Sequence, residues 1–236
     1  MKKFTFLISA VLLCLIIFNS CNNTIYPIYI PAAEPDIPIN NIIKDIPRYE
    51  NHKLFTYYIL SKQKQKQLKL SVPENGTDSL LIRIWYTYPQ GIYQFAELVE
   101  LHVDSAKTIS AKYIRMRIFW NVSRRYEIIN RHKDTVITPK SGWMSFMDTI
   151  KNLKITKLPT IEFIPKYTEI NGKNNFDYPN DKLTISVEIA TKKDYRFFQY
   201  CNLNKYNNID EVNRMYRFEL FMREQFPLVK IDKDWY

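Results

Sequence analysis

The segment Leu-Thr-Ile-Ser-Val-Glu-Ile-Ala, residues 183–190, decides the fold because it alternates apolar and polar residues most cleanly. Side chains on a β-strand point to opposite faces with a period of two. The aliphatic residues at its odd positions are expected to face the core, and Thr184, Ser186 and Glu188 to face solvent. The next segment of similar character, Tyr195–Leu203, is expected to be its antiparallel neighbour.

Three long segments upstream are also predicted to be strands. In Leu80–Tyr88 the apolar even positions share one face, which places Arg83 and Trp85 on the other. Phe95–Val103 and Lys112–Trp120 have the same β-branched and aromatic composition. Together these segments predict a sheet of several strands.

Shorter elements are predicted around these strands. Lys53–Leu60 and Leu68–Val72 have the composition of strands, and the charged run Lys62–Gln67 between them is expected to be an exposed turn. Tyr126–Arg131 and Thr135–Thr138 are expected to form a hairpin with a three-residue turn.

The hydrophobic period changes to three and four residues in two places. One helix is expected over about 142–153, with Ser141 as its N-cap. A final helix is expected over about 209–226, with Asn207 or Asn208 as its cap. Many strands with two main helices predict an α+β fold with a mostly antiparallel sheet.

Residues 1–20 have the features of an export signal. Lys2 and Lys3 are followed by Phe4–Phe18, a run of 15 uncharged and largely apolar residues. A membrane-spanning helix needs about 20 apolar residues, whereas the core of a signal peptide needs roughly 7 to 15. Export followed by cleavage is therefore predicted, and the alternatives are an uncleaved signal anchor and a plain secreted protein.

The end of this signal, Phe18-Asn19-Ser20-Cys21, resembles a lipobox, the processing site of bacterial lipoproteins cut by signal peptidase II. It departs from the usual pattern at Phe18 and Asn19, where leucine and a small residue are common. The resemblance implies cleavage before Cys21, a thioether from its thiol to diacylglycerol, and acylation of the new amino terminus, with palmitate as an expected acyl group. Two or more acyl chains give a stable membrane anchor.

The resemblance also implies a location in the bacterial cell envelope. Asn22 stands where an aspartate commonly retains a lipoprotein at the inner membrane, and residues 23–33 lack the acidic cluster typical of surface export. The periplasmic face of the outer membrane is therefore expected. Repeated prolines favour an extended tether over residues 21–47, with packing on the domain as the alternative, and residues 48–236 are expected to form one globular domain.

Cysteine count and charge limit the classes of partner. With Cys14 in the signal and Cys21 lipidated, Cys201 is the one remaining cysteine, so no intramolecular disulfide is expected. Without Lys2 and Lys3, 32 basic and 24 acidic residues leave a net charge of +8. For an exported protein this favours an anionic lipid, an acidic glycan or an acidic protein over nucleic acid, and dispersed surface lysines are the alternative.

The sequence contains none of the short motifs for nucleotide or serine-hydrolase chemistry. Its four glycines are far apart, and no serine lies between two of them at the spacing of a nucleophile elbow. His102 and Asp104 could supply two metal ligands from one strand, but two ligands do not make a site, so no metal or cofactor is expected. Cys201 has aromatic neighbours and is interpreted as core packing rather than as a nucleophile.

The candidate ligand-binding surface combines arginines and aromatic residues from two predicted strands. Guanidinium groups can bind carboxylate or phosphate through two hydrogen bonds, and aromatic rings stack on sugars. The alternative is a structural role, in which the arginines lie on aromatic faces and pair with Glu97, Glu100 or Glu188. The candidate residues are Arg83, Trp85, Tyr113, Arg115, Arg117 and Phe119.

Three hypotheses for function stay open at this point. The first is a non-catalytic lipoprotein that binds another envelope protein, as an adaptor, an assembly factor or an inhibitor. The second is a module that binds an acidic glycan or a lipid headgroup through Arg115 and Arg117. The third is an envelope hydrolase that uses Glu97, Glu100 or Glu188 as acid or base, which requires a pocket where two of them meet. The sequence favours a protein without catalytic activity.

Overall fold

The computed structural model describes residues 43–44, 53–77, 80–90, 93–120, 126–131, 134–171, 183–192 and 194–229. All of them belong to the second of two compact units, which covers residues 32–236. The predicted signal peptide and Cys21 lie outside the described residues. Within the described ranges, no helix has both the length and the apolar character that crossing a membrane requires.

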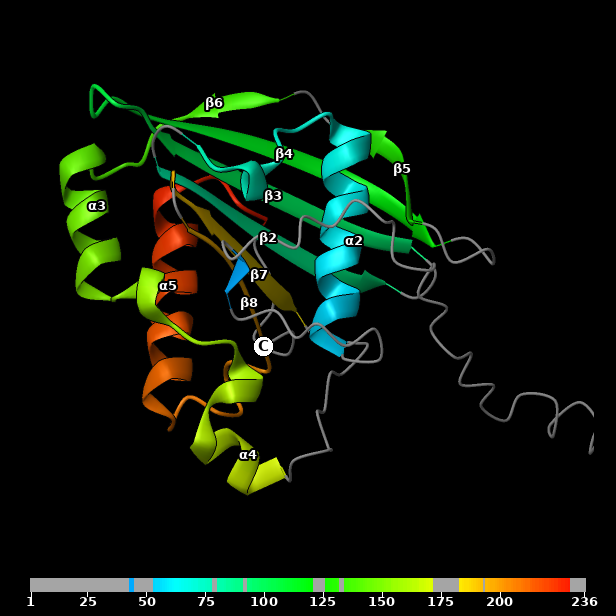
Figure 1. Ribbon diagram of the computed structural model, residues 1–236, viewed down its shortest axis with the longest axis vertical. Coiled ribbons are helices and arrows are strands. Elements are labelled where there is room, and N and C mark those ends of the chain that lie inside the picture. The colour runs from blue at the N-terminus through cyan, green and yellow to red at the C-terminus, as the bar shows by residue number, and fades with distance from the viewer. Residues whose placement is uncertain are drawn as a thin grey trace, which may run out of the picture. The chain divides into compact units, whose positions relative to one another are not determined.

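An open β-sheet forms the centre of the fold (Figure 1). Its strands are ordered β1-β8-β7-β2-β3-β4-β5, and β6 pairs with β4. The six strands from β8 to β5 are antiparallel to their neighbours, whereas β1 is parallel to β8. The strands are β1 (Ile43–Lys44), β2 (Leu80–Gln90), β3 (Tyr93–Val103), β4 (Ile109–Trp120), β5 (Tyr126–Arg131), β6 (Thr135–Ile137), β7 (Thr184–Ala190) and β8 (Tyr195–Cys201).

Helices cover both faces of this sheet, which confirms the predicted α+β fold. On the face called here the α5 face, α3 and α5 pack against the even positions of β2, such as Ile84 and Tyr86. On the opposite face, the α2 face, Leu60 and Leu68 of α2 pack with Trp85 in a smaller apolar cluster. The helices are α2 (Lys53–Leu68), α3 (Trp143–Asn152), α4 (Pro165–Asn171) and α5 (Asp210–Gln225), with the 3-10 turns η1 (Pro73–Asn75), η2 (Ile155–Lys157) and η3 (Ile161–Phe163).

Helix α2 replaces the first strand and the exposed turn predicted for residues 53–67, and the second strand predicted there, Leu68–Val72, does not form. Tyr58, Ser61, Gln65 and Leu68 are buried at the three- and four-residue spacing of a helix. Two of these four residues are polar, so the apolar residues alone do not repeat with a helical period. The prediction is wrong because the sheet beneath α2 supplies buried polar partners.

The predicted pairing of β7 with β8 is confirmed, but the predicted solvent face of β7 is wrong. Ser186 and Glu188 are only 6% and 1% exposed, and they lie on the α2 face. Thr184 is half-buried. A sheet that is covered on both faces buries polar as well as apolar positions, so alternation alone does not identify a solvent-facing side.

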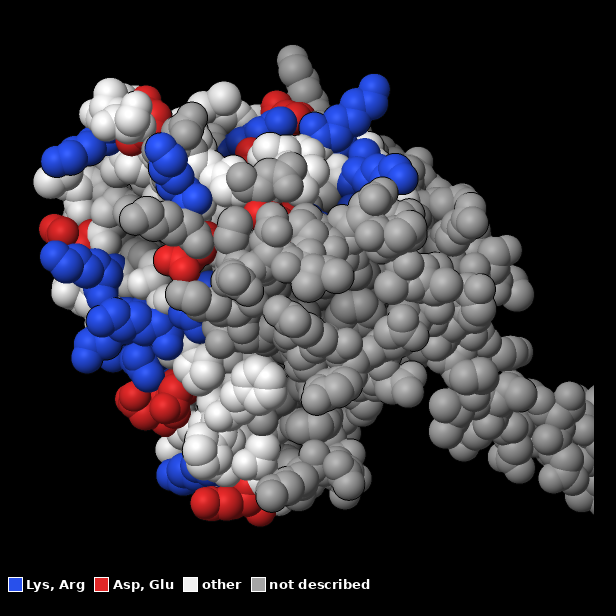
Figure 2. Space-filling model, viewed as in Figure 1, with Lys and Arg blue, Asp and Glu red and all other residues white. Residues whose placement is uncertain are grey.

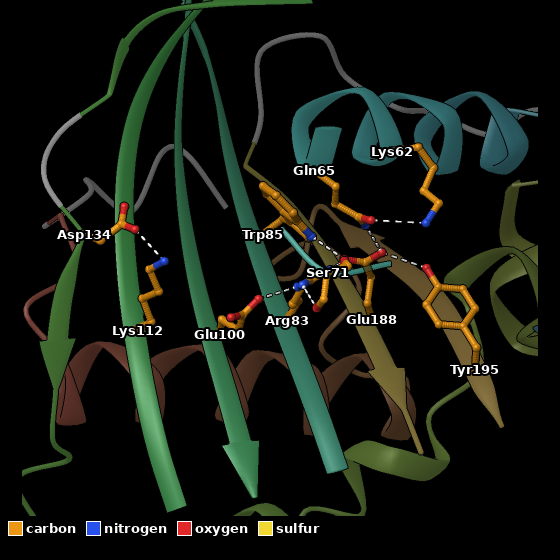
Figure 3. Close-up of polar contacts among 10 residues, drawn as sticks. All are labelled: Lys62, Gln65, Ser71, Arg83, Trp85, Glu100, Lys112, Asp134, Glu188 and Tyr195. Atoms are coloured by element: carbon orange, nitrogen blue, oxygen red, sulfur yellow. Dashed lines mark hydrogen bonds and ion pairs between the residues drawn. The ribbon is translucent and has the colours of Figure 1, made fainter. Parts of the chain in front are cut away.

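The two segments predicted as a hairpin, β5 and β6, do not pair with each other. Both are antiparallel to β4, with β6 opposite residues 111–113 and β5 opposite residues 116–120. An ion pair of 2.5 Å between Lys112 and Asp134 holds the start of this second segment to β4 (Figure 3). The hairpin prediction is wrong because β4, at 12 residues, is long enough to pair with both segments in turn.

The two predicted helices are confirmed as α3 and α5, although both N-caps differ from the prediction. Gly142, rather than Ser141, is the N-cap of α3, and its φ of 76° is a conformation that glycine adopts without strain. The backbone N–H of Ser141 instead donates to Gln225 at 2.8 Å. Ile209, rather than an asparagine, is the N-cap of α5.

The outer edge of β8 is covered in two ways. β1 pairs with Tyr195 and Arg196, and further along the strand the Thr160 hydroxyl accepts from the Gln199 N–H at 3.1 Å and donates to its carbonyl at 3.3 Å. Covering an edge strand prevents pairing with other chains. Since β1 falls within residues 21–47, the end of the predicted tether belongs to the sheet.

Candidate functional site

The six candidate ligand-binding residues do not form one surface. The strand register places Trp85 opposite Leu98 and Leu98 opposite Ile114, so Arg83 and Trp85 share the α2 face with the even positions of β4. The prediction of a single surface is wrong because alternation within each strand does not show which positions of two strands share a face. The other four candidates occupy odd positions and lie on the α5 face: Tyr113, Arg115, Arg117 and Phe119.

Arg83 and Trp85 are fully buried beneath α2 and have structural contacts. Arg83 donates to Glu100 at 2.6 Å, and to the carbonyl and hydroxyl of Ser71 at 2.9 and 2.8 Å (Figure 3). The indole N–H of Trp85 donates to Glu188 at 2.8 Å. Neither side chain is therefore available to a ligand at the surface.

Glu188 is the centre of a buried polar network on the α2 face (Figure 3). Its carboxylate accepts hydrogen bonds from Gln65 of α2, from the Trp85 indole, and from the Tyr195 hydroxyl at 2.7 Å. Burial, followed by the charge of Glu188, raises the pKa of Tyr195 well above its ordinary value. Tyr195 therefore stays protonated and continues to donate. Three donors offset the cost of burying the carboxylate and join α2 to the sheet.

Lys64 lies beside this network and is only 6% exposed. Its ammonium is 5.5 Å from the centre of the Trp85 ring and 3.4 Å from the Thr87 hydroxyl. Burial lowers the pKa of Lys64 to about 8, and the charge of Glu188 acts in the opposite direction. A buried lysine of this kind suits amine chemistry, but here the side chain is enclosed and not open to a substrate.

Glu97 is the corresponding buried acid on the α5 face. It accepts hydrogen bonds from the Tyr88 hydroxyl at 2.5 Å, from the Tyr113 hydroxyl, and from the Val229 N–H at 3.0 Å. Arg223 of α5 donates to the Tyr88 hydroxyl at 2.9 Å and to the Val229 carbonyl. Val229 is thus held through both its N–H and its carbonyl, which fixes the segment after α5 to the sheet.

The three acids proposed for a hydrolase do not come together. Glu97 lies on the α5 face, whereas Glu100 and Glu188 lie on the α2 face, on either side of Arg83 in the strand register. Glu100 pairs with Arg83, and Glu97 and Glu188 each bind three donors. These three residues therefore do not form the pair of free acids that the hydrolase hypothesis requires.

The exposed part of the candidate site is called here the β4 face. Arg115 and Arg117 are exposed, whereas its aromatic members are half-buried. The Arg115 guanidinium carbon lies 4.5 Å from the centre of the Phe95 ring, and Phe95 is opposite Arg117 in the register. A guanidinium that stacks on a ring can still donate from its edge to a carboxylate or a phosphate. The β4 face comprises Phe95, Tyr113, Arg115, Arg117 and Phe119.

The weaker candidates for metal and nucleophile chemistry have other surroundings. Asp104 accepts a hydrogen bond of 2.7 Å from the Thr108 N–H in the turn after β3, and His102 is exposed. Cys201 is 1% exposed, which agrees with the predicted core packing. In the part of the chain that the structure describes, no group of three or more ligand residues could hold a metal ion.

The site is interpreted from the residues of this chain alone. Comparisons with protein-family models, curated proteins and solved structures found no match. Strand alternation in the sequence identified the four residues of the β4 face that belong to strand β4. The sequence did not indicate that Lys64 is buried, because a run of charged residues usually marks a solvated segment. Tyr58, Ser61, Gln65 and Leu68 have the spacing of a helix, but two of them are polar, so no apolar period in the sequence indicates α2.

Proposed function

We propose that the chain is a lipoprotein of the bacterial cell envelope that binds another envelope protein without catalysing a reaction. In this proposal Cys21 carries the lipid, and the domain faces the periplasm from the outer membrane. The observation that supports binding is the β4 face, where Arg115 stacks on Phe95 beside exposed Arg117.

The composition of the β4 face favours a protein partner. Arginine, tyrosine and phenylalanine are enriched at the centres of protein interfaces. Tyr113 and Phe119 are already half-buried, and Arg115 already lies on a ring, so binding would immobilise little additional side-chain freedom. Two arginines on one strand face would complement an acidic patch on the partner.

The buried acids favour a binding role over catalysis. A general acid or base must reach the proton that it transfers. Glu97 and Glu188 are instead enclosed and hydrogen-bonded to tyrosine, tryptophan, glutamine and backbone donors. Their positions on opposite faces of the sheet support separate structural roles.

The proposal is tested by crosslinking in cells with the full-length chain, which carries an affinity tag after Tyr236. Proteins that co-purify from detergent-solubilised membranes are then identified, and one abundant, reproducible partner is expected. Truncation of an interface hot spot costs about 2 kcal/mol, so the Arg115→Ala, Arg117→Ala double variant should bind this partner roughly 100-fold or more weakly.

A matched control variant removes two positive charges from a different part of the surface. Lys140 and Arg217 are also exposed, and neither belongs to the β4 face. The Lys140→Ala, Arg217→Ala variant is expected to retain the partner, and urea denaturation should show that both double variants remain folded. Equal retention of the partner by the two double variants would show that the β4 face is not the binding surface.

A second candidate function is supported by the same two arginines. Guanidinium groups also bind the carboxylates of acidic glycans and the phosphates of lipid headgroups. Recovery of the tagged chain without any partner would contradict the first proposal. Binding of the purified chain to acidic glycans, lost in the Arg115→Ala, Arg117→Ala variant, would then support the second.

A further inference from the structure

Three exposed lysines occur at every third position from the last turn of α3 to the end of η2. Lys151, Lys154 and Lys157, called here the lysine ridge, are separated by three residues each and joined by backbone hydrogen bonds of 3.0 Å from residue 154 to 151 and from 157 to 154. Lys151 lies in the last turn of α3, Lys157 is the last residue of η2, and Lys154 lies between these two elements. Leu153 and Ile155 between the lysines, and Leu158 after them, are buried, whereas the three lysines are exposed.

Lys154 keeps a long side chain at a position where the backbone favours glycine. Its φ of 52° and ψ of 37° lie in the left-handed region, which costs a residue other than glycine roughly 1–2 kcal/mol. Local strain of this kind is often associated with a functional role of the side chain. Lys69 and Lys107 are also exposed lysines with a positive φ, so what distinguishes Lys154 is its position between two other exposed lysines.

The lysine ridge is held rigidly at the edge of the sheet where β1 joins the fold. Arg196 of β8 donates to the carbonyl of Thr156, and to that of Leu158 at 3.0 Å. The same Arg196 is opposite Lys44 of β1 in the register. The N-terminal strand of the described domain, β1, therefore pairs with β8 next to Arg196, the residue that holds the lysine ridge.

Basic side chains gather at the ridge, and acidic side chains adjoin them (Figure 2). Figure 2 shows Lys and Arg side chains gathered beside the end of α3. Asp148, one turn earlier, is the exposed acid of α3. Among the described residues, none of the three ridge lysines forms an ion pair, so their charges remain available to a ligand.

We infer that the lysine ridge docks the domain onto a surface of anionic phospholipid headgroups beside its lipid anchor. The inference rests on the anchor in the proposed function, because the anchor keeps the ridge near a bilayer. Each lysine close to an anionic membrane adds about fivefold to partitioning. This attraction falls off within a Debye length, about 8 Å at physiological salt.

The test is lysine footprinting of the full chain added to preformed vesicles. One set of vesicles contains phosphatidylcholine alone, and the other contains phosphatidylcholine mixed with phosphatidylglycerol. A water-soluble acetylating reagent modifies accessible lysines, which mass spectrometry then quantifies. The three ridge lysines should be acetylated several-fold more slowly on the anionic vesicles, whereas exposed Lys107 in the turn after β3 should be unaffected. Equal acetylation of the ridge on both vesicles would overturn the inference.

Two matched variants separate charge from folding. Lys107, like Lys154, is exposed and has a positive φ, of 64°, so Lys154→Gly and Lys107→Gly make the same chemical change and relieve the same kind of strain. Lys154→Gly should reduce the protection of Lys151 and Lys157 about fivefold, and Lys107→Gly should leave it unchanged. Identical protection in the two variants would overturn the inference.

A final measurement distinguishes failure of the ridge from failure of the anchor. Incorporation of labelled palmitate at Cys21 reports on the anchor alone. Incorporation without protection of the ridge would refute only the docking inference. Absence of incorporation would refute the anchor itself.

Discussion

Lys64 is a positive charge enclosed between α2 and the sheet, beside Trp85, Thr87 and Glu188. Burial disfavours the charged form, so the pKa of Lys64 falls to about 8 in the folded protein, against an ordinary value of 10.5. Between these pH values the unfolded chain binds more protons than the folded one. Stability therefore rises with pH across this window.

Substitution of this lysine is expected to stabilise the protein. The Lys64→Met variant keeps the length of the side chain and removes the buried charge, which should raise the free energy of unfolding at pH 7 by about 1–3 kcal/mol. In the wild type, the difference in pKa corresponds to a gain on the order of 3 kcal/mol between pH 8 and pH 10.5. Urea denaturation at intervals from pH 7 to pH 10.5 measures both effects.

Lys66 provides the control for this experiment because it lies on the same helix and is exposed. Lys66→Met should change neither the stability at pH 7 nor its dependence on pH by more than about 0.5 kcal/mol. If the Lys64→Met protein kept the pH dependence of the wild type, Lys64 would not be its source.

At the scale of secondary-structure elements, the turn between β3 and β4 has a residue type that does not suit its backbone. Lys107 has a φ of 64°, and its N–H donates to the Asp104 carbonyl at 3.0 Å. The Asp104 carboxylate in turn accepts from the Thr108 N–H at 2.7 Å. These hydrogen bonds hold the turn in the left-handed conformation at Lys107.

The Lys107→Gly variant is therefore expected to be more stable than the wild type. Removal of the left-handed penalty exceeds the extra backbone entropy of glycine, and the net gain should be about 0.5–1 kcal/mol. The midpoint of urea denaturation measures it. Lys140→Gly is a suitable comparison because that lysine is exposed and its φ is not positive. A loss of stability in Lys107→Gly would show that the side chain contributes a contact that outweighs the strain.

The same scale shows how far the fold follows from the sequence. The long strands and the helices α3 and α5 are predictable because their buried residues are mainly apolar and repeat with the period of the element. Helix α2 is not predictable in this way, because Lys64 and Gln65 are buried against polar groups that come from other segments of the chain. For the same reason, the burial of the Arg83 and Glu188 side chains could not be predicted.

The residues of the candidate site could be predicted only within each strand, and not as neighbours across different strands. Alternation identifies Arg115 and Arg117 as neighbours on one face of β4. It does not place Phe95 beneath Arg115, because that contact depends on the register between β3 and β4. Register is a property of the assembled sheet, and no local pattern in either strand specifies it.

At the scale of the whole molecule, the two surfaces proposed to bind lie toward opposite edges of the sheet. The lysine ridge contacts β8 through Arg196, next to β1, whereas the β4 face lies near the β5 edge. A domain docked through the ridge would therefore contact the lipid at the β8 side of the sheet and leave the β4 face, near the opposite edge, open to a partner.

The membrane attachment of the whole molecule is expected to depend on a single thiol. Cys21→Ala should abolish incorporation of labelled palmitate and shift the chain from the membrane fraction, because the thioether cannot form. Cys14→Ala removes the other N-terminal cysteine and should leave both readouts unchanged. Labelled palmitate in the Cys21→Ala protein would place the lipid elsewhere or rule out the lipobox interpretation.

The short strand β1 also has a mechanical consequence. Tension on the N-terminal segment reaches the described domain first at β1, which is paired over only two residues. Further load passes to α2, which is held to the sheet through side chains such as Gln65, and only then to the antiparallel strands. Because β8, β7, β2 and β3 lie between β1 and β4, loss of the β1 pairing would leave the strands next to the β4 face paired as before. A pull on the proposed lipid anchor is therefore expected to detach β1 and to leave the proposed binding surface intact.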